Sequence, residues 1–222
     1  MAPKPCIHVG IIGHPGHGKT TLTAALARVS AALYGGEAPR AIDHKSAPPA
    51  DGIQVHGAEV WYESLSRHYV HVDFATATDF LKALVARPAG IDGVLLVVDS
   101  RMGVEPDAGE QLALAHAAGI PGAAAFVTQV DRCDPVLVEA TADEVRELFQ
   151  ARGYPGAPVL RGSALHALHA VAAGQLRHPE VKAIRRLVQA MDDHIANSPV
   201  PHRHEEEPAS IIRSKRSRTA AA

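Results

Sequence analysis

The sequence is poor in cysteine, aromatic residues and net charge. Its 222 residues include only two cysteines, Cys6 and Cys133, which cannot form a disulfide framework in a chain of this length. Aromatic residues make up 4%, and 22 Lys and Arg stand against 24 Asp and Glu, a formal net charge of -2. Proteins that attract nucleic acid or anionic membranes by overall charge are therefore disfavoured.

Long apolar runs are also missing. No stretch approaches the roughly 18 apolar residues that cross a bilayer. The first residues, Met1 to Pro5, lack the apolar core of a signal peptide. Together with the low cysteine content, these absences predict a soluble cytoplasmic protein with no membrane partner.

The apolar residues that are present, 46% of the chain, suffice for one sizeable core. A β-branched run over residues 7–12 precedes a helical pattern that starts at Lys19, and residues 53–62 and 67–74 favour an antiparallel hairpin. Helix-like and strand-like segments then alternate over residues 79–86, 93–98, 108–118, 122–127, 135–152, 157–160 and 179–196. This alternation predicts an α/β fold whose mostly parallel sheet is covered on both faces.

Two segments fall outside this alternation. Residues 34–51 contain paired glycines and three prolines, which predict a long exposed loop. Beyond residue 197 the chain holds an acidic block, Glu205–Glu207, and a basic stretch, Arg213–Arg218, with too few apolar residues to fold. We expect residues 1–197 to form one domain and residues 198–222 a disordered charged tail.

A phosphate-loop pattern lies between the first strand and the first helix. Residues 13–20 read Gly-His-Pro-Gly-His-Gly-Lys-Thr. The glycines let the backbone wrap around a phosphate, the Lys19 ammonium can reach the β- and γ-phosphates, and the Thr20 hydroxyl can ligate Mg²⁺. The loop residues expected to contact a nucleotide are Gly13, His14, Gly16, His17, Gly18, Lys19, Thr20 and Thr21.

The residues around this loop, together with Arg67–Asp73, Glu144–Leu148 and Arg161–Leu165, resemble the G domain of the elongation factor Tu family of translational GTPases. The resemblance runs from about residue 7 to about residue 195. It implies a P-loop NTPase G domain, with a six-stranded, mostly parallel sheet and helices on both faces. It also implies GTP or GDP as ligand, with Mg²⁺ held by Thr20 and, through water, by Asp73.

The same resemblance places the guanine-reading segment at residues 128–131, where the family has Asn-Lys-Cys-Asp and this chain has Thr-Gln-Val-Asp. Asp131 can still accept hydrogen bonds from guanine N1 and N2, whereas Thr128 and Gln129 depart from the family. A second base contact, a backbone amide toward guanine O6, is intact. The predicted base contacts are Thr128, Asp131, Ser163, Ala164 and Leu165, with weakened affinity for guanine.

The two segments that sense the γ-phosphate in the family depart further. Residues 51–55, Asp-Gly-Ile-Gln-Val, lack the family's threonine, with Gln54 in its place. In residues 73–77, Asp-Phe-Ala-Thr-Ala, Ala77 stands where the family's histidine orients the attacking water. Positioning accounts for most phosphoryl-transfer catalysis, so GTP hydrolysis is expected to be weak or lost, and no catalytic residue is predicted.

Two functions remain open from the sequence. One is a guanine-nucleotide-binding protein with slow or residual GTP hydrolysis. The other is a pseudo-GTPase that acts through protein contacts, for example with a protein of the translation apparatus. The family carries aminoacyl-tRNA with two β-barrel domains that this sequence lacks, so tRNA delivery is not expected. A decaying duplicate without a selected role is a third possibility.

Other groups that could carry chemistry have simpler explanations. The 14 histidines include the pairs His166/His169 and His202/His204, but no cysteine or carboxylate set accompanies them at metal-ligand spacing. Solvated surface histidines are therefore favoured over a metal site. The basic stretch of the tail is typical of a solubilising terminus rather than an RNA contact, and Cys133 has no base arranged around it, which favours a packing role.

Overall fold

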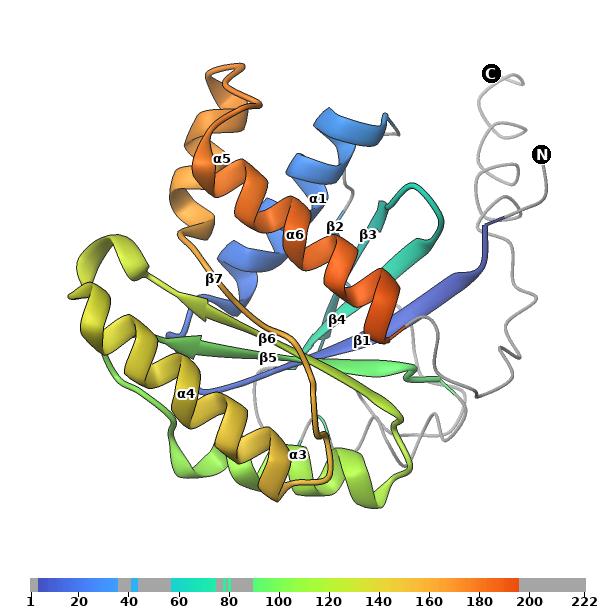
Figure 1. The fold of residues 1–222 in the computed structure, drawn as a ribbon. Helices are drawn as coiled ribbons and strands as arrows, with labels where there is room; N and C mark the ends of the chain where they lie inside the picture. Colours follow the sequence, from blue (N-terminus) through green and yellow to red (C-terminus); the bar gives the residue numbers. More distant parts are fainter. Residues whose placement is uncertain are drawn as a thin grey trace.

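The computed structural model describes residues 4–35, 41–43, 57–74, 78, 80 and 90–195. In this part the chain forms one sheet with the strand order β2-β3-β4-β1-β5-β6-β7, flanked by helices (Figure 1). The strands are β1 (Cys6–Ile12), β2 (Ala41–Asp43), β3 (Gly57–Glu63), β4 (His68–Phe74), β5 (Gly93–Asp99), β6 (Gly122–Thr128) and β7 (Val159–Arg161). The helices are α1 (Lys19–Tyr34), α3 (Pro106–Ala117), the short 3₁₀-helix η2 (Val130–Arg132), α4 (Pro135–Ala151), α5 (Ala164–Ala172) and α6 (Pro179–His194).

The sheet is mostly parallel, as the alternation of strands and helices predicts. Strand β1 pairs in parallel with β4 and β5, and the parallel pairing continues through β6 to β7. Strands β3 and β4 form the predicted antiparallel hairpin. The α/β fold with a mostly parallel sheet is therefore confirmed.

The predicted six strands are joined by a short seventh, β2, which pairs antiparallel with β3 at the edge of the sheet. It lies inside residues 34–51, which the sequence predicts as a loop, because three residues between prolines and glycines are too few to give a strand pattern. The remainder of that loop after Gly35 lies outside the described residues. So do the charged tail and, apart from Phe80, the helix expected over residues 79–86; Phe80 is helical and fully buried.

Both faces of the sheet are covered. Every residue of β5 and β6 is buried, which explains why these strands read as continuous apolar runs. Leu95 and Val97 pack with α1, α5 and α6, whereas Leu96 and Val98 pack with α3 and α4 (Figure 1). The two larger of the three cores among the described residues thus lie on opposite faces of the paired strands β1, β5 and β6.

The last turn of α6 closes the first of these cores. Ile195, directly after α6, is 1% exposed and lies against Gly93 and Gly122, the first residues of β5 and β6. A Cβ atom at Gly93 would overlap Ile195 Cγ2, so any larger residue there would displace the Ile195 side chain. Helix α6 thereby covers the amino ends of two central strands.

A buried polar cluster fixes the β3–β4 hairpin to α6. Asp192 of α6 accepts hydrogen bonds from Tyr69 Oη at 2.9 Å and from Ser64 Oγ at 3.0 Å. Beside Tyr69, the fully buried His71 ring is joined through Nε2 to Tyr62 Oη at 2.7 Å. Burial lowers the pKa of His71 to about 3, so this imidazole is neutral in the folded protein at neutral pH.

The neutral His71 predicts a loss of stability in mild acid. Below pH 6.5 the unfolded chain binds a proton at this histidine, whereas the folded chain does so only near pH 3. The free energy of unfolding should therefore fall by about 1.4 kcal/mol per pH unit across this window because of His71. Urea unfolding between pH 7.5 and 4.5 measures the slope, and His71→Gln should reduce it. Val72→Ala, in the same strand, should shift the curve without changing its slope; equal slopes for His71→Gln and the wild type would contradict the prediction.

Candidate functional site

The loop between β1 and α1 is shaped by two glycines with different surroundings. Gly13 has a φ of +130°, and a Cβ atom there would overlap the carbonyl oxygen of Val97 in β5. Gly16 has a φ of +89° and is exposed, with no heavy atom within 4 Å of a Cβ placed on it. The loop is therefore pressed against β5 at its start and open on its outer side.

Side chains of α3 and of the loop itself stabilise this conformation. The Gly13 amide donates to Gln111 Oε1 at 2.8 Å, and His14 Nδ1 lies 3.1 Å from Asp107 Oδ2. The buried His17 ring places Nδ1 3.3 Å from the Val97 carbonyl oxygen. Burial lowers the pKa of His17 although this hydrogen bond opposes the shift, so His17 serves as a neutral packing group.

The loop also holds a positive charge. Lys19 is 8% exposed, and its Nζ folds over the loop to donate to the carbonyls of Gly13 at 2.8 Å and His14 at 3.3 Å. Helix α1 begins at the same residue; its N-cap, Gly18, has no side chain for capping, and no acidic residue lies in the first turn. The first turn of α1 thus adds no carboxylate of its own to offset the positive end of the helix dipole, which lies beside the Lys19 ammonium.

These features fit a polyphosphate bound with Mg²⁺. Anions bind at helix N-termini of this kind, where backbone amides and a lysine converge. Thr20, at the second position of α1, is exposed on the same turn and could supply a hydroxyl ligand, while Thr21 is half-buried. Asp73 lies in β4 opposite Ile11 of β1, which places its backbone near the strand end that leads into the loop.

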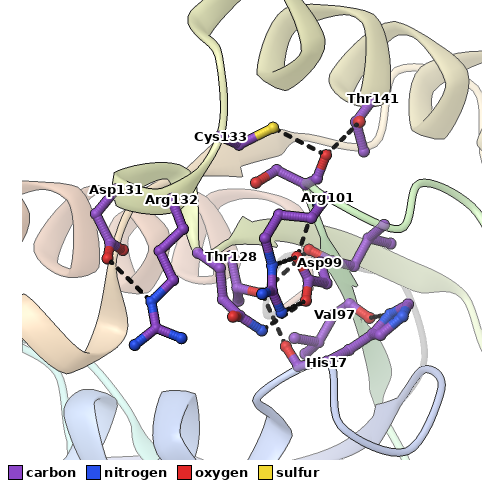
Figure 2. A network of polar contacts seen from close by, with 12 residues as sticks. His17, Val97, Asp99, Arg101, Thr128, Asp131, Arg132, Cys133 and Thr141 are labelled. Atoms are coloured by element: carbon purple, nitrogen blue, oxygen red, sulfur yellow. Dashed lines mark hydrogen bonds and ion pairs between the residues drawn. The ribbon is translucent and has the colours of Figure 1, made fainter.

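Thr128, at the end of β6, ties three segments together (Figure 2). Its Oγ1 donates to the His17 carbonyl oxygen of the loop at 2.7 Å and approaches the Val98 carbonyl oxygen of β5 at 3.2 Å. The hydroxyl thus connects β5, β6 and the phosphate-binding loop. Its hydrogen is used within the protein.

The residues predicted to read a base lie beside this connection. Helix η2 places Asp131 next to Ser163, the N-cap of α5, whose Oγ accepts from the His166 amide at 3.3 Å. Burial raises the pKa of Asp131, but a hydrogen bond from Ser163 and the nearby positive groups outweigh it, so the pKa lies below its usual value. Asp131 is therefore an ionised acceptor at neutral pH.

The second predicted base-reading segment is fixed by α6. The Ser163 amide donates to Glu180 Oε2 at 2.6 Å, so the first turn of α6 holds the start of α5 in place. Ala164 is buried and Leu165 is exposed. The structure therefore brings together the predicted residues of segments 13–21, 128–131 and 163–165, which follow the carboxyl ends of β1, β6 and β7.

A buried carboxylate at this site was missed by the sequence analysis. Asp99 ends β5, and its fully buried side chain accepts bonds from Arg101 Nε at 3.1 Å, Arg101 Nη2 at 2.7 Å and Gln129 Nε2 at 2.7 Å. Burial raises the pKa of Asp99, but the Arg101 hydrogen bonds outweigh it, and the net pKa is lowered. The sequence signal for this buried carboxylate is an aspartate that ends an otherwise apolar strand.

Several predicted residues lie outside what the structure describes. They are Gln54, Thr76 and Ala77, the side chain of Asp73, and the tail histidines His202 and His204. Within the described ranges no three His, Cys, Asp or Glu side chains gather as a metal site, and His166 and His169 are exposed on α5. Among the same residues, no helix is both long and apolar enough to cross a membrane.

Comparison with known protein families adds one match. The family model described as "Elongation factor Tu GTP binding domain" matches residues 4–197. The match covers the sheet, the phosphate-binding loop and both predicted base-reading segments. Its extent is much more than half of the 222 residues.

The Thr128 hydroxyl predicts a measurable contribution to stability. Thr128→Val removes the donor and leaves the His17 carbonyl oxygen unpaired, so the free energy of unfolding should fall by about 1–3 kcal/mol. Thr128→Ser keeps the hydroxyl and loses only a methyl group, so it is the matched control. Urea unfolding of the three proteins tests the difference; an equal loss in the Val and Ser variants would show that the hydrogen bond contributes nothing.

Proposed function

The chain belongs to the family of elongation factor Tu GTP binding domains, and we propose that it binds GTP or GDP with Mg²⁺ and hydrolyses GTP slowly or not at all. Residues 1–197 form the nucleotide-binding domain in this proposal. The observation that carries it is the position of the Lys19 ammonium over the loop carbonyls, at a helix N-terminus that has no side-chain cap. Asp131, ionised at neutral pH, follows β6, whose terminal Thr128 bonds to the same loop.

The phosphates are held by the loop and the first turn of α1. Lys19 offers its ammonium to the β- and γ-phosphates, and the amides at the start of α1 add the positive end of the helix dipole. Thr20 and Asp73 would hold Mg²⁺, which supplies charge neutralisation of the phosphates when bound. Binding at this end follows the general rule that ligands of open α/β sheets lie at the carboxyl ends of the strands.

The base is read by two segments. Asp131, ionised and hydrogen-bonded to Ser163, accepts from guanine N1 and N2, and the backbone amide of Ala164 or Leu165 donates to O6. Thr128 acts on the loop and not on the base, because its hydroxyl bonds to the His17 carbonyl. The site thereby keeps guanine recognition with fewer polar contacts than the family's Asn-Lys-Cys-Asp segment allows, which lowers affinity.

A pseudo-GTPase that acts through protein contacts is the alternative, and nucleotide binding separates the two functions. If the wild-type protein binds no nucleotide, the loop between β1 and α1 has only a structural role, and the pseudo-GTPase alternative holds. A partner in the cytoplasmic translation apparatus is compatible with either function. Delivery of tRNA is not part of the proposal.

Replacing Lys19 tests the phosphate site. Lys19→Ala should weaken GDP binding by at least about 100-fold, because the positioned ammonium is lost while the loop backbone remains. Isothermal titration calorimetry with GDP and Mg²⁺ measures the change. Lys182→Ala, which removes an exposed lysine from α6, is the control for overall charge. Equal GDP affinity in the Lys19 variant and the wild type would overturn the assignment.

Hydrolysis is tested by single-turnover phosphate release from bound GTP. The wild-type rate should not exceed about 10⁻³ per second, because Ala77 offers no group to orient water. Ala77→His alone should not restore turnover, since Gln54 and Thr76 also depart from the family. The triple variant Gln54→Thr, Thr76→Gly and Ala77→His is the positive control. A rapid burst of phosphate release from wild-type protein would contradict this part of the proposal.

A further inference from the structure

Asp99, Arg101 and Gln129, here called the Asp99 cluster, stand beside the proposed base site. The Asp99 carboxylate accepts four N–H groups: the Arg101 backbone amide at 2.9 Å, Arg101 Nε and Nη2, and the Gln129 amide. A carboxylate with no exposed area is unfavourable unless donors of this number surround it. The buried charge of Asp99 is therefore balanced by hydrogen bonds within the cluster.

The bonds to Asp99 fix the plane of the guanidinium. Arg101 donates through Nε and Nη2, which is the two-pronged contact that a planar guanidinium makes with a carboxylate. The Arg101 side chain is still 44% exposed, whereas that of Asp99 is 0% exposed. One edge of the guanidinium is thus anchored in the interior, and the remainder reaches the surface with a set orientation.

The cluster lies where a base would be read. Asp99 and Thr128 are opposite each other at the carboxyl ends of β5 and β6, and Gln129 follows directly. Figure 2 shows Arg101 folded back onto Asp99 beside Thr128. Asp99 dominates the electrostatic surroundings that raise the pKa of Arg101, and Asp131 also contributes, so the guanidinium is within electrostatic reach of the base-reading carboxylate.

Gln129 is held in a conformation that serves the cluster. Its φ of 58° lies in the left-handed region, which is unfavourable for a residue other than glycine. The bond from its amide to Asp99 stabilises this conformation. Because glutamine is uncharged, the exposed cations beside the proposed base site are Arg101 and Arg132, and Arg132 Nε lies 3.8 Å from Asp131 Oδ2.

We propose that the face of the Arg101 guanidinium lies against the purine ring whose edge Asp131 reads. Arginine faces stack on aromatic rings through cation–π attraction, and every purine offers such a face. Arg101 would add affinity without choosing the base, while Asp131 makes the choice. This inference rests on the proposed nucleotide-binding function and assigns Arg101 as a base-contacting residue.

Ligands that differ in their base isolate the contact. The test measures binding of GDP, inosine diphosphate and inorganic pyrophosphate, each with Mg²⁺, by calorimetry. Arg101→Ala should weaken GDP and inosine diphosphate alike, by about 3- to 30-fold, and leave pyrophosphate unchanged. Arg146→Ala, on α4, removes an arginine that pairs with Asp143 and Glu139 and should change none of the three affinities.

Two further variants separate a base contact from a structural role. Arg101→Lys keeps a cation for Asp99 but loses the planar group, so its affinities should lie between those of the wild type and Arg101→Ala. The double variant Asp99→Ala and Arg101→Ala leaves no unpaired buried charge, and thermal unfolding verifies that it folds. It should show the same selective loss for the two nucleotides.

Three other results would overturn the inference, and each has a different meaning. An equal loss for pyrophosphate would assign Arg101 to the phosphates. Unchanged GDP affinity in folded Arg101 variants, with Lys19→Ala impaired, would leave the Asp99 cluster as a structural ion pair and keep the proposed function. No nucleotide binding by the wild type would overturn both.

Discussion

The close approach of Gly13 to the Val97 carbonyl determines how the whole site is arranged. Only glycine fits at this point, both for its positive φ and because a Cβ atom would overlap the carbonyl. With the loop seated on β5, the Val97 carbonyl also meets the His17 ring, and Gln111 reaches the Gly13 amide. Lys19 then lies at the start of α1 with its ammonium over the loop. A looser contact at Gly13 would displace each of these groups.

Residues 128–131 differ from the family's Asn-Lys-Cys-Asp segment, yet their side chains are ordered by hydrogen bonds. Thr128 uses its hydroxyl to hold the loop, and Gln129 uses its amide to satisfy a buried carboxylate. Both side chains therefore act within the protein. In the proposed function, the base is recognised by groups that their neighbours orient: Asp131 through Ser163, and Arg101 through Asp99. The order of this region rests on hydrogen bonds within the protein.

The sequence predicts the parts of the structure that follow a periodic or local rule. Strands β5 and β6 are evident as unbroken apolar runs, and the phosphate-binding loop as a spacing of glycines and lysine. Strand β2 is too short for a period of two to register. The whole Asp99 cluster could not be predicted, because Asp99 and Gln129 are thirty positions apart and meet only when β5 and β6 pair. The αL conformation of Gln129 and the burial of His71 likewise come from tertiary contacts.

The position of Ile195 against β5 and β6 has a consequence for the order in which the chain can fold. Residues of β1 and α1, such as Ile7 and Leu22, share a core with Leu187 and Met191 of α6. During synthesis the first strands are complete long before α6 exists, so this core stays open until the last helix has formed. Contacts so distant in sequence slow folding and prolong the exposure of apolar strands. The apolar residues of this core therefore stay accessible to other chains until residue 195 docks on Gly93 and Gly122.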